Sequence, residues 1–291
     1  MRIAHIINPF QPDESSDLFF AQQVTFETIR KAKREALGIV DVDVCCVSYP
    51  EDQHIIPSDF ISMPFLKESV TDKAYFQKPR KLPLIAEILD VVFQRTDAEF
   101  YIYSNIDISL YPNFYLHIVD TLNQGYDAMI INRRRIPALY HSLNDLDLIL
   151  KQQGKSHPGF DCFVFHKSLL SKLYLADICI GVPFFEISFS QNLFAFSKKF
   201  LWLKDGNQTF HIGMEIFMRR QPSEYLDYNR SQYYRVINKL WPDMSIHKIP
   251  FAEKSFFVRF FKWALHPCFP ICLMMMLQLR DWGIYQRKKD G

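Results

Sequence analysis

Apolar and polar positions alternate in strand-like and helix-like blocks through the first half of the chain. Short apolar runs bounded by turn residues predict strands at residues 2–7, 40–47, 100–103 and 128–131. Apolar residues at helical spacing predict helices at residues 19–37, 84–95 and 114–123. This alternation favours an α/β fold with a mostly parallel sheet flanked by helices, because parallel strands need crossover connections.

The pattern changes after residue 250, where aromatic and basic residues are interleaved. We expect residues 1–250 to form one domain and residues 251–291 a C-terminal helical appendix. Its first part contains Phe256, Phe257, Phe260, Phe261 and Trp263 among Lys254, Arg259 and Lys262. This composition is typical of peripheral attachment to an anionic membrane surface, but a helix packed on the domain or on a second subunit fits it equally well. The apolar run at 267–277 holds two prolines and is shorter than the roughly 20 residues of a spanning helix.

Composition and charge narrow the function classes. The 291 residues are 48% hydrophobic and 23% charged, as in an ordinary globular protein. A formal net charge of +2 argues against nucleic acid as a partner. The six cysteines lack the spacing of a zinc site and predict free thiols in a reducing compartment. Asn8 and Pro9 interrupt the first apolar run, which therefore predicts a strand, no export signal and a cytoplasmic location.

Asn105 and Asp107 directly follow the predicted strand at residues 100–103. A hard divalent cation that bridges a nucleotide diphosphate prefers oxygen ligands and one or two carboxylates, and phosphates and waters complete its shell. Ligands of open α/β sheets bind beyond the carboxyl ends of the strands, where these two residues fall. Asn and Asp are also good turn formers, so the pattern alone leaves both interpretations open.

The run resembles the DxD region of GT-A glycosyltransferases, present here as Asn-Ile-Asp. The resemblance is carried by residues 81–83, the following helix, residues 103–108 and residues 114–115, and later motifs extend it over roughly residues 1–215. It implies a GT-A-like fold and a nucleotide-diphosphate sugar as donor. It also implies Mn²⁺ or Mg²⁺ held by Asp107 and Asn105 against the donor diphosphate.

Two further groups are candidates for binding the donor or the acceptor. Arg133 and Arg134 follow the strand at 128–131, and planar guanidinium groups suit phosphate, although an arginine run is also common in solvated turns. His157 and Asp161 lie in a Gly-containing turn that resembles the acceptor or donor-sugar loop of GT-A enzymes. Asp161 is expected to accept hydrogen bonds from sugar hydroxyls; the alternative is a turn-capping Asp161 and an exposed His157.

Glu186 and His211 complete the candidate site. Glu186 is the acidic residue of an apolar run, and burial raises the pKa of a carboxyl and makes it a better base near neutral pH. In inverting GT-A members a carboxylate of the second half removes the acceptor proton, a role open to Glu186 or Asp161. The resemblance also makes His211 a metal ligand. The alternatives are a Glu186 that faces water and a structural His211.

These features together favour a metal-dependent glycosyltransferase that moves a sugar from a nucleotide-diphosphate donor to a hydroxyl acceptor, which is a glycan, a lipid-linked molecule or a small molecule. Two rivals remain. A non-catalytic, membrane-associated scaffold would explain the aromatic C-terminal segment. A sugar-phosphate nucleotidyltransferase would need a Gly-rich phosphate loop after the first strand, and residues 8–12 do not form one.

Overall fold

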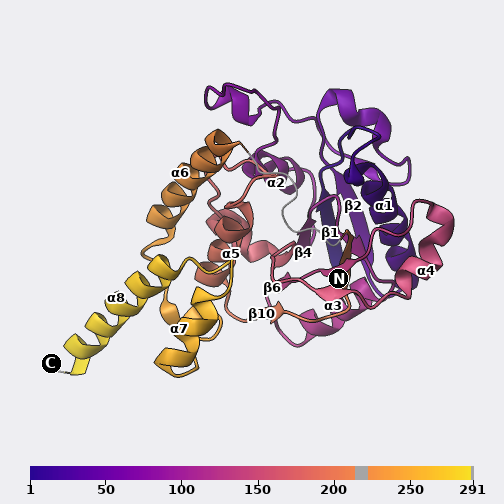
Figure 1. Cartoon of the computed structure of the whole chain (residues 1–291). Helices are drawn as coiled ribbons and strands as arrows, with labels where there is room; N and C mark the ends of the chain where they lie inside the picture. The colour runs from indigo at the N-terminus through magenta and orange to yellow at the C-terminus, as the bar shows by residue number, and fades with distance from the viewer. Residues whose placement is uncertain (214–221, 290–291) are drawn as a thin grey trace.

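The computed structural model describes residues 1–213 and 222–289 (Figure 1). They form a mixed α/β structure with a mainly parallel sheet flanked by helices, which confirms the predicted fold class. The strands of the main sheet are β1 (Arg2–Ile7), β2 (Asp41–Cys46), β3 (Ile61–Ser62), β4 (Phe100–Ser104), β6 (Ala128–Ile131), β9 (Cys162–His166) and β10 (Phe200–Leu203). Their spatial order is β10-β6-β9-β4-β1-β2-β3, and β9 runs antiparallel to both of its neighbours.

Helices cover both faces of this sheet (Figure 1). The longer helices before the C-terminal segment are α1 (Asp17–Glu35), α2 (Ile85–Phe93), α3 (Phe114–Asn123), α5 (Phe185–Phe196) and α6 (Ser223–Leu240). Successive strand residues point to opposite faces, so Tyr101 and Tyr103 of β4 join the core under α2, α5 and α6, whereas Ile102 joins the core under α1 and α3. Both faces are buried, which explains why the central strands are apolar almost throughout.

A second, smaller sheet lies beside the carboxyl ends of the main strands. It contains β5 (Ser109–Leu110), β11 (Thr209–Ile212), β7 (Arg134–Ile136) and β8 (Lys155–Ser156) in that order. Strands β5 and β7 continue the chain a few residues beyond β4 and β6, and β11 pairs with both of them. The small sheet therefore ties together the turns that follow β4 and β6. The short helix α4 (Leu146–Leu150) precedes β8.

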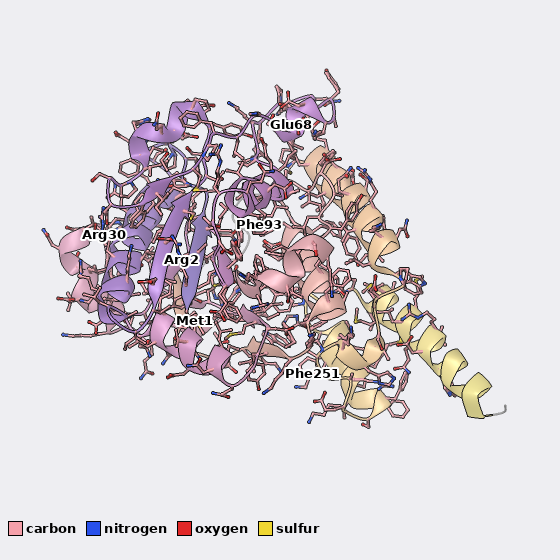
Figure 2. All side chains as sticks on the ribbon, turned by 180° about the vertical axis from the view of Figure 1, so that it is seen from behind. Met1, Arg2, Arg30, Glu68, Phe93 and Phe251 are labelled. Atoms are coloured by element: carbon pink, nitrogen blue, oxygen red, sulfur yellow. The ribbon has the colours of Figure 1, made fainter. Side chains whose placement is uncertain are left out.

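The C-terminal segment shares the core of the sheet domain and also has an exposed side. It forms α7 (Phe256–Ala264) and α8 (Ile271–Lys289). Trp263 is fully buried and donates from Nε1 to the Pro250 carbonyl at 2.8 Å, and Met274 and Leu277 belong to the same apolar cluster as α5. Figure 2 shows Phe251 where this region meets the rest of the molecule. Within residues 1–213 and 222–289, no helix is long and apolar enough to cross a membrane.

Candidate functional site

The strand order places a topological switch point between β1 and β4. The chain proceeds from β1 outward through β2 to β3 and then returns to β4 on the other side of β1. In open α/β sheets, ligands bind in the crevice outside the carboxyl ends of the strands at such a point. Asn105 and Asp107 follow β4 at this edge, and Arg133 follows β6 at the same edge.

The antiparallel strand β9 brings Asp161 to this edge as well. Cys162, its first residue, pairs with Ser104 at the end of β4 and with Ile131 at the end of β6. Asp161 immediately precedes Cys162, so it lies between the turns that carry Asp107 and Arg133. The direction of β9 therefore brings Asp161 to the same edge as Asp107 and Arg133, because an antiparallel strand begins where its neighbours end.

Asp107 meets His211 across the small sheet. Residues 109–110 of β5 pair antiparallel with residues 209–210 of β11, and this register brings the residues just before β5 beside those at the end of β11. His211 Nε2 lies 3.1 Å from Asp107 Oδ2, and the two side chains keep 17% and 22% of their surface exposed. Burial disfavours the charged form of Asp107, but the hydrogen bond and charge of His211 and the charge of Arg133 leave its pKa below the ordinary value.

Both the backbone and the side chain of Asn105 form hydrogen bonds within the turn. Its carbonyl accepts the Ile108 N–H at 3.0 Å, which closes the turn, and its side-chain oxygen accepts the Tyr103 hydroxyl at 3.4 Å. The turn-forming role of Asn105 is thus present, and Asp107 is the member of the motif that faces His211. Among the described residues, no group of three or more His, Cys, Asp and Glu side chains is arranged to hold a metal.

Arg133 and Asp161 form a buried ion pair beside this couple. The Arg133 Nη1 donates to Asp161 Oδ1, with side-chain exposures of 17% and 4%. Burial raises the pKa of Asp161, and the Asp107 charge adds to this, although Arg133 opposes it. Arg133 Nε and Asp161 Oδ2 are buried without a hydrogen-bond partner. Arg133 therefore retains an unused hydrogen-bond donor, and Asp161 an unused acceptor, at the edge of the sheet.

His157 and Arg134 shape the loop that carries Asp161. His157 is buried, which excludes the exposed alternative, and its Nδ1 accepts the Gly159 N–H at 2.9 Å. A Cβ at Gly159 would lie 2.5 Å from His157 Cε1, so this turn requires glycine. Burial and the charge of Arg133 lower the pKa of His157 to about 3, which keeps the ring neutral. Arg134 donates to the carbonyls of Gln153 and Gly154 and thereby fixes the preceding turn.

Glu186 lies in the first turn of α5, and its charge acts on the same cluster. The helix starts after Phe184, whose φ of 80° turns the chain into the helix. Burial raises the pKa of Glu186 to about 7, with a further rise from Asp161 and Asp107 and opposition from Arg133. The side chain is half-buried. Its carboxyl is thus poised to change protonation state near neutral pH.

Tyr103 and Asn132 belong to the site but were not singled out from the sequence. Burial raises the pKa of Tyr103, and Glu186 and Asp107 add to this rise, so its hydroxyl lies in the field of both acids. Asn132 donates to the His157 carbonyl at 3.0 Å and accepts from Trp202 Nε1 at 2.8 Å. Each polar group stands at the end of a central apolar strand, and that position is the signal that would have identified it.

The fold and site define a mixed α/β protein with an acid–imidazole couple at the switch point of its sheet. Neither a known family profile nor a curated protein sequence matches the chain. Solved structures with a similar fold include S. aureus TarS 1–349 in complex with UDP-GlcNAc, at a TM-score of 0.46 and 10% identity, over 88% of this chain and 76% of that chain.

Glucosyl-3-phosphoglycerate synthase from Mycobacterium tuberculosis is a second structure of similar fold, at a TM-score of 0.44 and 17% identity over 83% of this chain and 80% of that chain. Its complex with Mn²⁺, UDP-glucose and phosphoglyceric acid aligns at a TM-score of 0.46 and 13% identity, over 82% of this chain and 80% of that chain. The likeness is one of fold alone.

Proposed function

We propose that this protein is a metal-dependent glycosyltransferase of GT-A type, which moves a sugar from a nucleotide-diphosphate donor to a hydroxyl acceptor. The observation that carries the proposal is the Asp107–His211 couple at the switch point of the sheet, with the Arg133–Asp161 pair and Glu186 beside it. The cluster combines a carboxylate and an imidazole with further acid and guanidinium groups. Such groups can stabilise the charge of a departing diphosphate and remove a proton from the acceptor.

The couple fits a divalent cation. Neighbouring ligands of an octahedral ion at about 2.1 Å from the metal lie about 3.0 Å apart, and the observed separation between His211 Nε2 and Asp107 Oδ2 is 3.1 Å. One carboxylate and one imidazole leave most of the coordination positions to phosphate oxygens and water, as expected of Mg²⁺ or Mn²⁺ bound with a nucleotide. When bound, the ion would neutralise the negative charge that develops on the leaving diphosphate.

Arg133 and Asp161 then have complementary tasks. The unused Arg133 Nε–H is a donor for a phosphate or sugar oxygen, and the unused Asp161 Oδ2 is an acceptor for a sugar hydroxyl. Their mutual ion pair holds both groups in place. We assign them to binding and orientation of the donor, with the neutral His157 supporting the Asp161 loop.

Glu186 is the favoured general base. A general base whose pKa lies near the working pH is largely ionised and still has adequate affinity for a proton. The pKa of Glu186 lies at about 7. Asp161 is the weaker candidate because one of its oxygens is already bonded to Arg133. In this scheme Glu186 takes the proton of the acceptor hydroxyl as the oxygen attacks the sugar.

We also propose that the protein attaches peripherally to an anionic membrane surface, and the exposed side of α7 supports this. Phe257, Phe261 and Leu265 keep 73%, 59% and 83% of their surface exposed, and Lys262 lies among them. Aromatic side chains with neighbouring cations suit the boundary between headgroups and acyl chains of anionic lipid. Flotation with phosphatidylcholine vesicles, with and without phosphatidylglycerol, tests this: Phe257→Ser should reduce flotation, and equal flotation of both proteins would contradict it.

A thermal-shift experiment tests the transferase assignment directly. UDP-, GDP- and dTDP-linked sugars are added to the full chain with and without Mn²⁺, and at least one should stabilise the protein only when the metal is present. The shift should vanish in Asp107→Asn and persist in Asp97→Asn, a matched change at a carboxylate that is 89% exposed. If no nucleotide sugar stabilises the wild-type protein in a metal-dependent manner, the assignment is overturned.

A further inference from the structure

A groove of about 620 Å³ lies between α7 and the end of β10. Its walls include Trp202, Phe251, Val258, Phe261, Leu265 and His266. Val258, Phe261 and Leu265 are spaced to lie along one side of α7, so the outer end of the groove is continuous with the exposed apolar face of this helix. An apolar chain that is inserted among the aromatic residues of α7 would thus have a path inward.

The inner end of the groove reaches the loops of the candidate site. Asn132 and Pro158 line it, and each is the direct neighbour in sequence of a site residue, Arg133 and His157 respectively. Asn132 also links the two regions physically, since its side chain bonds both to Trp202 Nε1 in the groove wall and to the His157 carbonyl. A molecule that fills the groove would therefore end beside the cluster to which we assign transfer.

In the part of the chain that the structure describes, three charged side chains line the groove: the cations Lys204 and Lys262 and the acid Asp205. The Lys204 ammonium lies 4.4 Å from the ring centroid of Trp202 and 3.9 Å from that of Phe251, and Lys262 lines the same groove. Partial burial lowers the pKa of Lys204, and the charge of Lys262 lowers it further, although Asp205 and Glu253 oppose this. The two cations outnumber the acid Asp205, so this described lining carries a net positive charge that favours an anionic group.

His266 adds a neutral donor to the same wall. Its Nδ1 accepts the Cys268 N–H at 3.2 Å, so the neutral ring carries its proton on Nε2. Burial and the nearby Lys204 lower the pKa of His266 to about 4, which keeps the ring uncharged at neutral pH. The groove thus offers apolar side chains on α7, a lining of net positive charge, and uncharged polar groups beside the loops of the site.

We propose that this groove binds an amphiphile with an anionic headgroup, taken from the membrane surface to which α7 is proposed above to attach. The apolar chain lies along Val258, Phe261 and Leu265, and the anionic group lies between Lys204 and Lys262. If the chain is the glycosyltransferase proposed above, the bound amphiphile is its acceptor, whose hydroxyl points toward Glu186. The groove itself needs neither the donor nor the metal.

Calorimetric titration with dodecyl phosphate, below its micelle concentration, tests the groove in the full chain without metal or nucleotide. Dodecyl phosphate should bind about tenfold more tightly than dodecanol or inorganic phosphate, because only it offers both the chain and the charge. Leu265→Ser and Lys262→Gln should each weaken binding about tenfold. Both side chains are exposed, so neither change disturbs the core.

Matched controls separate the groove from the general surface of α7. Phe257→Ser on α7 and Lys239→Gln on α6 alter an exposed aromatic and an exposed cation that do not line the groove, and both should leave the affinity unchanged. Equal weakening in all four variants, or equal binding of dodecyl phosphate and dodecanol, would overturn the proposal. In a transfer assay, Leu265→Ser should raise the KM for an amphiphilic acceptor but not that for the donor. Binding without transfer to any acceptor would refute the transferase assignment and leave the groove in place.

Discussion

His211 Nε2 lies 3.1 Å from Asp107 Oδ2 because β11 pairs with β5, the short strand that follows the Asn105–Asp107 turn. The antiparallel register of β5 and β11 places the residues just before β5 beside the end of β11, and this pairing brings the two side chains together. A couple so placed can serve either as a structural ion pair or as two adjacent metal ligands. The two roles differ in their response to added metal.

Mn²⁺ binding should depend on both members of the couple. Asp107→Asn and His211→Ala should each reduce the affinity for Mn²⁺ by more than about 10-fold, because loss of even an outer-shell partner of a metal site typically costs about 10- to 100-fold. Electron paramagnetic resonance of free Mn²⁺ measures this in the presence of UDP. Asp205→Asn changes an exposed acid that lines the groove and is not part of the couple, and this variant should bind Mn²⁺ as the wild type does. Unchanged affinity in both couple variants would leave the ion-pair role as the explanation.

The transfer rate should rise with pH and level off above about 7. Glu186 must be ionised to accept a proton, and burial places its pKa at about 7. Glu186→Gln should lower kcat by about 10²- to 10⁴-fold and remove the acidic limb of the pH profile. The matched variant Glu253→Gln, at a carboxylate that is 65% exposed, should keep both. An acidic limb that persists in Glu186→Gln would move the base to another group.

The Arg133–Asp161 pair should show strong coupling in urea unfolding. Arg133→Ala leaves the buried Asp161 carboxylate without its cation, so a loss of about 3–5 kcal/mol in the free energy of unfolding is expected. The double variant Arg133→Ala/Asp161→Ala should be more stable than Arg133→Ala alone, because the uncompensated charge is gone. Arg134→Ala removes hydrogen bonds to two carbonyls and should cost less. Additive losses in the double variant would show that the pair is not coupled.

The sequence predicted the separate motifs of the site better than their assembly. Apolar periodicity gave β4 and β6, and hence the strand ends at which Asp107 and Arg133 stand. The position of Asp161 between them depends on β9, which enters the sheet antiparallel between β4 and β6. Residues 162–165 are apolar on both faces, and such a run carries no signal of its direction or neighbours. The apolar pattern of the sequence therefore could not predict the ion pair of Arg133 with Asp161.

The C-terminal segment shows a similar limit. Its interleaved aromatic and basic residues were equally compatible with a membrane surface and with packing on the domain. The structure contains both buried and exposed aromatic side chains in this segment. Trp263 is fully buried against the Pro250 carbonyl, whereas Phe257 on the same helix is 73% exposed. In a short helix with apolar residues at most positions, composition does not indicate which side faces the core. Only the tertiary contacts distinguish the two sides.

Acid should destabilise the protein through His5, a polar residue in the middle of β1. His5 is fully buried and bonded to the Tyr115 hydroxyl at 2.7 Å and the Ser104 hydroxyl at 2.9 Å. Burial lowers its pKa to about 3 in the folded protein, against 6.5 for the free side chain. Above pH 6.5, His5 is neutral in both the folded and the unfolded chain, so it does not change the free energy of unfolding with pH. Below pH 6.5, the unfolded chain binds a proton at His5 that the folded chain excludes. The free energy of unfolding should therefore fall by about 1.4 kcal/mol per pH unit from this group between pH 6.5 and 3.

Urea titrations at several pH values between 7.5 and 4.5 measure this slope. His5→Gln should be less stable than the wild type at pH 7.5, because its hydrogen bonds are altered, yet its stability should fall less steeply toward acid by the equivalent of one proton. The exposed His54 provides the matched change, and His54→Gln should keep the wild-type slope. Burial also lowers the pKa of His157 and His266, so part of the slope should survive in His5→Gln. A slope identical to that of the wild type would mean that His5 takes up a proton within the folded protein, in conflict with its enclosed position under α3.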